Sequence, residues 1–394
     1  MKWPADRMES QRGKGFGMYP RAAALEREGA DVIHLEVGRP AFDTPVDIKE
    51  AAKQALDAGI VHYGDLQGTE RLRQALARKL SEFNGLPAGP ENVLVTTGLT
   101  QASFATFMAA LDPGDEVLVL EPRYPQHPPK IALTGATVVP VPLDPERGYR
   151  VDPERVEAAI TPRTKMLVLV NPANPVGTVF TRDELAVLAD IAIRRDLLVV
   201  TDEVYEYITY DGRQHTSIAA LPGMWERTVS LFAFTKAYAM DGWRLGYAVA
   251  PTELLGDIHR IAMNETTHPN VFAQEGAVAA VEGDQQPRHD MVAEDRRCRD
   301  LVYERLNAMP GVRCHLPEGS IYAFPDVSGL GQPDPEFAEQ LLHEAHVATE
   351  PGSSYGAMGQ GHLRVCFGSE PYARLEEAMD RMAKYVQSVA PAHD

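Results

Sequence analysis

Residues 229–249 read Val229-Ser230-Leu231-Phe232-Ala233-Phe234-Thr235-Lys236-Ala237-Tyr238-Ala239-Met240-Asp241-Gly242-Trp243-Arg244-Leu245-Gly246-Tyr247-Ala248-Val249. The apolar runs 229–232 and 247–249 predict two buried strands with a polar segment between them. Lys236 follows the first strand, and Arg244 stands eight residues after the lysine. A lysine amine forms a Schiff base with a carbonyl, and an arginine holds a phosphate through two parallel hydrogen bonds. An aldehyde and a phosphate on one small molecule describe pyridoxal phosphate.

Similar apolar runs recur upstream and alternate with helical patterns. They cover residues 93–96, 116–120, 166–170 and 197–201. Several are apolar almost throughout, which is typical of strands buried on both faces of a sheet. Between two of them, Thr181 and Glu184 form a capping-box pattern that predicts a helix to about Arg195. The alternation predicts an α/β fold with a mostly parallel central sheet flanked by helices.

The pattern changes at residues 284–287, a polar break that precedes a charged helix expected from about Met291 to Met309. We therefore expect a large domain over residues 46–285 and a smaller α+β domain over residues 286–394. Residues 1–45 form an N-terminal segment expected to pack with the small domain. Its first 30 residues are polar and carry alternating Gly13, Gly15 and Gly17, which predicts a mobile arm rather than a dinucleotide fingerprint, because no apolar strand precedes them.

Composition excludes several classes of protein. The 394 residues carry a formal net charge of −18, which argues against a surface for nucleic acid or an anionic membrane. No apolar run reaches the length of a membrane span. The three cysteines, Cys298, Cys314 and Cys366, match no metal-binding spacing, so we expect no metal site and a reducing, cytoplasmic location.

Polar segments follow four of the predicted strands. These segments are Gly98-Leu99-Thr100, Asn171 to Gly177, Asp202 to Tyr205, and the loop of Lys236. Each has an ordinary structural explanation alone: a turn, a helix cap or a solvated lysine. Because ligands of open α/β sheets bind beyond the carboxyl ends of the strands, their joint occurrence predicts a binding site at that edge.

Together these motifs resemble the class I/II (fold type I) pyridoxal-phosphate-dependent aminotransferases, over about residues 31 to 385. The matching segments, in the family's order, are 35–45, 63–73, 97–102, 122–125, 171–177, 202–205, 235–247, 351–353 and 362–365. The resemblance implies the fold type I architecture and the cofactor pyridoxal 5'-phosphate.

The resemblance also implies a role for each site residue. Lys236 would hold the cofactor through a Schiff base and act as the catalytic base. The remaining cofactor-binding residues would be Tyr63, Gly98, Leu99, Thr100, Tyr124, Asn174, Asp202, Tyr205 and Arg244. Among these, Asp202 would hold a proton on the pyridine nitrogen, Tyr124 would stack on the ring, and Asn174 and Tyr205 would bind its phenolic oxygen.

Substrate binding is implied for Gly38, Asn174 and Arg364, with Arg364 gripping the α-carboxylate. Tyr63 usually reaches the phosphate of the neighbouring subunit in this family, which implies a homodimer with shared active sites. The implied reaction moves an amino group between an L-amino acid and a 2-oxo acid.

Two alternatives remain open at this point. A pyridoxal phosphate enzyme of the same fold can instead be an oxidase, lyase or cyclase of specialised metabolism, because a few pocket residues decide the outcome. An aminotransferase-like transcription regulator is the second alternative, but it requires a basic DNA-binding segment that this acidic chain lacks.

Some residues depart from the common family pattern or have no assigned role. Ala233, Val176 and Asp241 stand where a serine or glycine, a threonine and a threonine are usual, so the subgroup stays undetermined. Glu350 is a candidate to face the substrate side chain, and Arg39 and Arg123 are candidates for a second substrate carboxylate. The spacing of His343 and His346 alone does not predict a metal site.

Overall fold

A computed structural model describes residues 3–11 and 17–390 of the chain. Its centre is a seven-stranded sheet with the strand order β2-β8-β7-β6-β5-β3-β4. The strands are β2 (Val93–Thr96), β3 (Glu116–Glu121), β4 (Thr137–Pro142), β5 (Thr164–Val170), β6 (Leu198–Asp202), β7 (Thr228–Ala233) and β8 (Gly246–Val249). Only β8 runs antiparallel to its neighbours, so the predicted mostly parallel sheet is confirmed.

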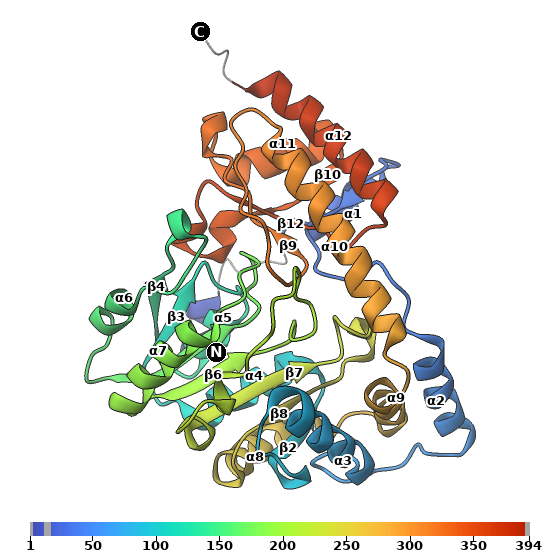
Figure 1. The fold of residues 1–394 in the computed structure, drawn as a ribbon, viewed down its shortest axis with the longest axis vertical. Coiled ribbons are helices and arrows are strands. Elements are labelled where there is room, and N and C mark those ends of the chain that lie inside the picture. The colour runs from blue at the N-terminus through green and yellow to red at the C-terminus, as the bar shows by residue number, and fades with distance from the viewer. Residues whose placement is uncertain (1–2, 12–16, 391–394) are drawn as a thin grey trace.

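Helices cover both faces of this sheet (Figure 1). They are α2 (Val46–Asp57), α3 (Glu70–Lys79), α4 (Gly98–Ala110), α5 (His127–Leu133), α6 (Pro153–Ala158), α7 (Arg182–Arg194), α8 (Thr252–Thr266) and α9 (Val271–Glu282). Alternate residues of one strand enter different cores: Leu118 packs with α6 and α7, and Val117 packs with α4, α5 and α8. This two-sided burial explains why the strands are apolar almost throughout.

The capping box that opens α7 forms as predicted. The hydroxyl of Thr181 accepts a hydrogen bond from the backbone N–H of Glu184 at 3.2 Å, and the Glu184 carboxylate accepts one from the backbone N–H of Thr181 at 2.9 Å. Two otherwise unpaired donors at the start of the helix are thereby satisfied.

The C-terminal part gathers above the sheet in Figure 1. It contains α10 (Gln286–Asn307), β9 (Tyr322–Ala323), α11 (Asp334–Ala345), β10 (Val347–Ala348), β11 (Glu350–Pro351), β12 (Leu363–Cys366) and α12 (Tyr372–Val389). The strands β11, β12 and β9 form a three-stranded sheet, and β10 pairs with β1 (Ile33–His34). Helix α10 begins at Gln286, earlier than the predicted Met291. Pro287 lies in its first turn, where backbone N–H groups have no partner within the helix, so the missing N–H of a proline does not interrupt the helix. The division into domains at residues 45/46 and 285/286 stays a prediction.

The N-terminal segment is more ordered than predicted. A 3₁₀ helix covers Asp6–Gln11, and α1 covers Tyr19–Arg27. Met18 and Ala22 pack in a small core with Val32, Leu342 and Ala348, so the mobile arm predicted for this stretch is wrong over α1. Gly13 and Gly15 lie outside the described residues.

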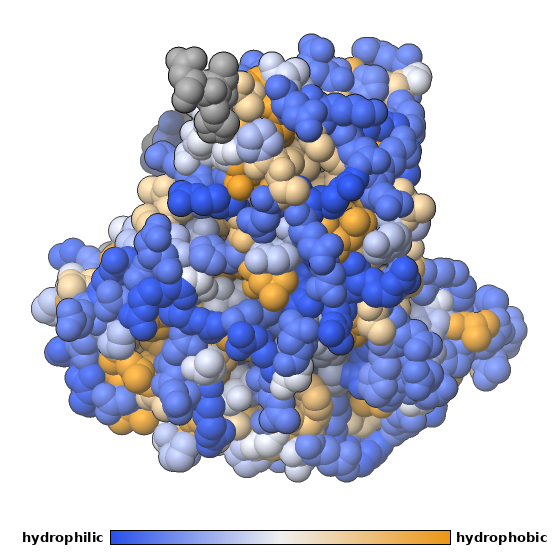
Figure 2. Space-filling view, turned by 45° about the horizontal axis from the view of Figure 1, so that its top comes forward, coloured by the Kyte–Doolittle hydropathy of each residue, from blue (hydrophilic) through white to orange (hydrophobic). Residues whose placement is uncertain are grey.

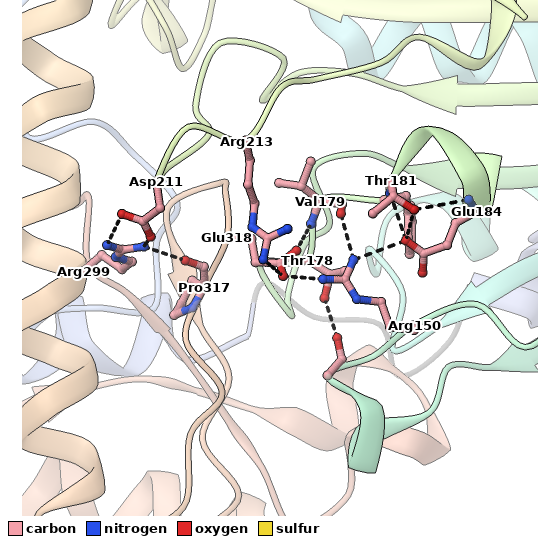
Figure 3. A network of polar contacts seen from close by, with 12 residues as sticks. Arg150, Thr178, Val179, Thr181, Glu184, Asp211, Arg213, Arg299, Pro317 and Glu318 are labelled. Carbon is pink, nitrogen blue, oxygen red and sulfur yellow. Dashed lines mark hydrogen bonds and ion pairs between the residues drawn. The ribbon is translucent and has the colours of Figure 1, made fainter. Parts of the chain in front are cut away.

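A polar network joins the C-terminal part to the sheet region (Figure 3). The carboxylate of Glu318 accepts hydrogen bonds from Arg150 and from the backbone N–H of Val179, and it pairs with Arg213 at 2.6 Å. Nearby, Arg299 of α10 pairs with Asp211 at 2.5 Å. These partly buried charges fix the segment around residue 318 against the strand ends.

Candidate active site

The structure brings the polar segments after the strands to one edge of the sheet, as predicted. Strands β3, β5, β6 and β7 are mutually parallel neighbours, and β2 runs the same way because it is antiparallel to β8. The chain therefore leaves all five strands at the same edge. The residues after these strands include Gly98, Tyr124, Asn174, Asp202 and Lys236.

Lys236 lies three residues beyond the end of β7 and is half-buried. Its Nζ donates a hydrogen bond to the carbonyl oxygen of Gly38, which is 198 residues away in the sequence. A Cβ on Gly38 would lie 1.9 Å from the hydroxyl of Tyr322, so no side chain fits at this position. The lysine and the predicted substrate-binding glycine are thus neighbours.

The first turn of α4 and the guanidinium of Arg244 lie next to each other. Gly98 has a φ of +74°, and a Cβ added to it would lie 2.7 Å from Nη2 of Arg244. A Cβ on Gly246 would lie 2.8 Å from the backbone nitrogen of Leu99. Backbone N–H groups at a helix N-terminus attract anions, and the exposed guanidinium of Arg244 adds a positive charge. Thr100 is exposed in the same turn.

Asp202 ends β6 and contacts a histidine that the sequence analysis missed. Its Oδ2 lies 3.2 Å from Nε2 of His127, and both side chains are buried. Burial lowers the pKa of His127, so the imidazole is neutral and Nε2–H donates to the carboxylate. The ring of Tyr124 lies edge-on to that of His127, with 5.1 Å between centroids. The sequence signal was a histidine three residues after Tyr124, which is too common a spacing to single out.

Asn174 and Tyr205 lie at the ends of the neighbouring strands. Asn174 is 3% exposed, and its Oδ1 is a buried polar atom with no hydrogen-bond partner in the described part of the chain. The hydroxyl of Tyr205 donates to that of Tyr322 at 2.9 Å. An orphaned buried amide oxygen is rare in a native protein and marks a place where a ligand completes the hydrogen bonding.

Arg364, on β12, is a buried guanidinium held by two aromatic rings. Its Cζ lies 4.4 Å from the ring centre of Tyr322 and 5.2 Å from that of Tyr355. One Nη donates to the carbonyl oxygen of Glu36, and Nε has no hydrogen-bond partner within residues 3–11 and 17–390. A buried cation with a free donor is suited to bind a carboxylate.

Glu350 of β11 lies opposite Arg364 of β12 in the backbone register of the two strands, and its side chain is buried at 8% exposed. It accepts a hydrogen bond from the backbone N–H of Met18 at 2.8 Å, and burial raises its pKa. The hydrogen bond from Met18 therefore occupies one oxygen of the Glu350 carboxylate.

The remaining candidates make contacts of their own, and Arg123 lines a cavity together with Tyr124, His127 and Asn174. Tyr63 is 90% exposed, and its ring contacts His268. Arg123 pairs with Glu121, and Arg39 lies 3.8 Å from Glu370. These contacts give both arginines a structural partner.

The three departures from the family pattern sit in different surroundings. Ala233 ends β7, Val176 is buried, and Asp241 is exposed. The two histidines considered for metal do not converge: His343 pairs with Glu339, and His346 ends α11 in a left-handed conformation.

Behind the site, Glu203, Glu206 and His215 place ligand atoms within 4.8 Å of one another. Lys79 pairs with Glu206 at 2.5 Å, and His215 hydrogen-bonds Glu203 at 2.6 Å. Because Lys79 already pairs with this cluster, we do not assign a metal site to the cluster.

Comparison with known proteins identifies the family. The family model described as aminotransferase class I and II matches residues 30–382. The chain belongs to the class I and II aminotransferases. It is 40% identical to the aspartate aminotransferase of Pyrococcus abyssi, over 91% of this chain and 92% of that protein. It is 37% identical to an arginine–pyruvate transaminase of Pseudomonas aeruginosa, over 96% and 95% of the two chains.

The fold comparison gives the same family. The crystal structure of the Thermus thermophilus aspartate aminotransferase with maleate matches with a TM-score of 0.92 and 38% identity, over 98% of this chain and 100% of that one. This aminotransferase therefore has the predicted fold type I architecture, and it moves an amino group between an L-amino acid and a 2-oxo acid. The oxidase, lyase, cyclase and regulator alternatives are not favoured. Among the described residues, no helix is long and apolar enough to cross a membrane.

Proposed function

We propose that this aminotransferase uses pyridoxal 5'-phosphate, held at the edge of the sheet by Lys236 and the residues around it. The observation that carries the proposal is the convergence of an anion cradle, a buried carboxylate and a lysine at adjoining strand ends. The cradle of Gly98 and Arg244 offers donors to a phosphate, and the buried Oδ1 of Asn174 is unused hydrogen-bonding capacity farther along the same edge of the sheet. When bound, pyridoxal phosphate supplies an electron-accepting ring that stabilises negative charge on the substrate α-carbon.

Each cofactor-binding residue has a distinct role in this proposal. The backbone N–H groups of Leu99 and Thr100, together with Arg244, bind the phosphate. Asp202 binds the ring nitrogen as an anion, and the neutral His127 orients the Asp202 carboxylate through its N–H. Tyr124 packs on the ring, and Asn174 and Tyr205 bind the phenolic oxygen.

In this proposal Arg364 orients the substrate, and Lys236 transfers its proton. The guanidinium of Arg364 binds the α-carboxylate as a two-pronged donor. Gly38, whose carbonyl accepts from Lys236, lets the substrate approach without a side chain in the way. Nζ of Lys236 then takes the proton from the substrate α-carbon as a general base. The aromatic walls of Tyr322 and Tyr355 exclude water from Arg364.

A homodimer is part of the proposal. Apolar side chains are exposed around α2 and the loop after it: Val46 is 70% exposed and Val61 is 54% exposed. Exposed apolar groups of this kind gather at interfaces. On the face that Figure 2 shows, hydrophilic residues predominate and apolar residues form small separate groups. Tyr63 lies in the apolar segment, so it is available to the phosphate of a second copy.

A cytoplasmic location is also proposed. It rests on the three cysteines, which are buried and unpaired in the structure.

A screen of the common amino acids tests the proposed function. Purified protein loaded with pyridoxal phosphate is incubated with one amino acid and one 2-oxo acid, and both products are measured by mass spectrometry. We expect a new amino acid and a new 2-oxo acid in equal amounts, and none from Lys236→Ala. Lys165→Ala, which changes an exposed lysine on β5, serves as the control. Release of free ammonia in place of a second amino acid would contradict transamination.

The names of the relatives do not identify one substrate for this chain. Proteins of similar identity are named for aspartate and for arginine, and Arg39 and Arg123, the candidates for a second carboxylate, have acidic partners. We therefore propose an L-amino acid and a 2-oxo acid without a narrower class.

A further inference from the structure

Lys130 is a buried lysine that the proposed mechanism does not use. It lies on α5 and is 9% exposed. Its Nζ donates a hydrogen bond of 2.7 Å to the hydroxyl of Ser103, a neutral partner. Burial of an ammonium is costly, and here it lowers the pKa of Lys130 to about 8. A lysine kept at such a position with no direct carboxylate partner among the described residues calls for a role.

The hydrogen bond from Lys130 connects two parts of the cofactor site. Ser103 lies on α4, one turn after the anion cradle, and its hydroxyl contacts the carbonyl oxygens of Leu99 at 2.9 Å and Thr100 at 3.2 Å. Lys130 follows His127 by one helical turn, so the two side chains share a face of α5. His127 in turn contacts Asp202. The lysine therefore ties α5 to the first turn of α4.

Three titratable groups act on Lys130 electrostatically. Asp202 on β6 and Glu265 on α8 both favour the charged lysine, and the lysine lowers the pKa of His127 on its own helix. Glu265 is exposed, so solvent screens its charge. Asp202 is buried and is the main counter-charge.

We propose that Lys130 is a positioning residue of the cofactor site, whose ammonium, anchored on Ser103, contributes positive charge to the surroundings of Asp202 and His127. Burial already keeps His127 a neutral donor; the charge adds to that effect and attracts the Asp202 carboxylate, which would face the cofactor ring. This inference rests on the proposed function, because it requires the cofactor to bind beside Asp202.

The charge has a measurable effect on the bound cofactor. A positive charge opposes protonation of the group that joins the cofactor to Lys236. A unit charge about 10 Å away, at an effective dielectric constant of about 20, shifts a pKa by about one unit. Removal of the lysine charge should therefore raise the pKa that is seen in the visible spectrum of the holoenzyme.

The experiment titrates the visible absorbance of substrate-free holoenzyme from pH 5 to 9. Lys130→Met removes the charge and keeps the stem, and Lys130→Arg keeps the charge. We expect a rise of about one pH unit for Lys130→Met. Lys130→Arg and the exposed-lysine control Lys165→Met should stay within about 0.3 units of the wild type. Lys130→Gln repeats the test if the methionine variant does not fold.

Two outcomes would overturn the inference. One is an unchanged spectral pKa in both neutral variants. The other is an equal shift in Lys130→Arg and Lys130→Met, because the charge would then not be the cause. A wild-type protein that binds no cofactor and shows no visible band would instead overturn the proposed function, so the two failures are distinguishable.

Discussion

The substitution Gly98→Ala tests the anion cradle by adding a single methyl group. The new Cβ would lie 2.7 Å from Nη2 of Arg244, which is inside van der Waals contact. Nη2 ends a flexible, exposed side chain, so the guanidinium can move aside at little cost to the fold. The proposed phosphate ligand is then displaced, while the rest of the site keeps its structure.

The expected magnitude has two separable parts. A positive φ of +74° strains an alanine by about 1–2 kcal/mol, which lowers the stability of the apoprotein. Loss of one charge-assisted hydrogen bond to phosphate costs about 1.5–3 kcal/mol, so cofactor affinity should fall about 10- to 150-fold.

Two matched glycines separate these effects. Gly148 has a φ of +72° and nothing within 4 Å of an added Cβ, so Gly148→Ala carries the strain without the contact. Gly242 has open space and no positive φ, so Gly242→Ala should carry neither. Thermal unfolding of the apoproteins measures the strain, and titration with pyridoxal phosphate measures affinity. The reasoning fails if Gly98→Ala binds the cofactor as tightly as Gly148→Ala does.

Three further predictions concern other regions. Burial raises the pKa of Asp295 to about 8, so its contribution to stability is present below about pH 4 and is lost as the pH rises toward 8. Asp295→Asn should therefore match the wild type in its free energy of unfolding near pH 4 and exceed it by about 1.4 kcal/mol more for each pH unit up to about pH 8, as measured by urea unfolding at several pH values; a difference that does not change with pH would contradict this. Arg364→Lys should lower kcat/KM for the amino acid about 10- to 100-fold in steady-state assays, because an ammonium cannot form the two-pronged contact; an unchanged value would remove Arg364 from substrate binding. Glu318→Gln should lower the free energy of unfolding in urea by about 1–3 kcal/mol, since it removes the carboxylate shared by Arg150 and Arg213, and a neutral effect would show that the network in Figure 3 is not stabilising.

The strands of the sheet could be predicted because burial on both faces leaves an unmistakable apolar signature. The exception is β4, which the sequence analysis missed. Its sequence contains Pro140 and Pro142, which argue against a central strand. The strand lies at the edge of the sheet, where one side needs no hydrogen-bond partner, so the prolines are tolerated.

Helix α1 was missed for a different reason. Its apolar face is narrow, and the segment is polar overall, so composition alone predicted a mobile arm. The helix is stabilised by tertiary contacts, such as that of Ala22 with Leu342, which lie far apart in the sequence.

Some residues of the candidate site could be predicted from the sequence, and others could not. Residues that follow strands, such as Asp202 and Lys236, could be found because topology places strand ends together. His127, Tyr322 and Lys130 could not, because each is connected to the proposed site through a neighbouring side chain and carries no local motif. Lys130 has the sequence signature of an ordinary surface lysine, and only its 9% exposure and its contact with Ser103 distinguish it.

The central claim is that Lys236 holds the cofactor, and chemical trapping measures this directly. Holoenzyme is reduced with borohydride, which makes the bond between lysine and cofactor permanent, and is then digested and sequenced by mass spectrometry. The account predicts one phosphopyridoxyl group, on Lys236, and its loss together with the visible band in Lys236→Ala. A label on another lysine, or an unchanged visible band in Lys236→Ala, would contradict the account.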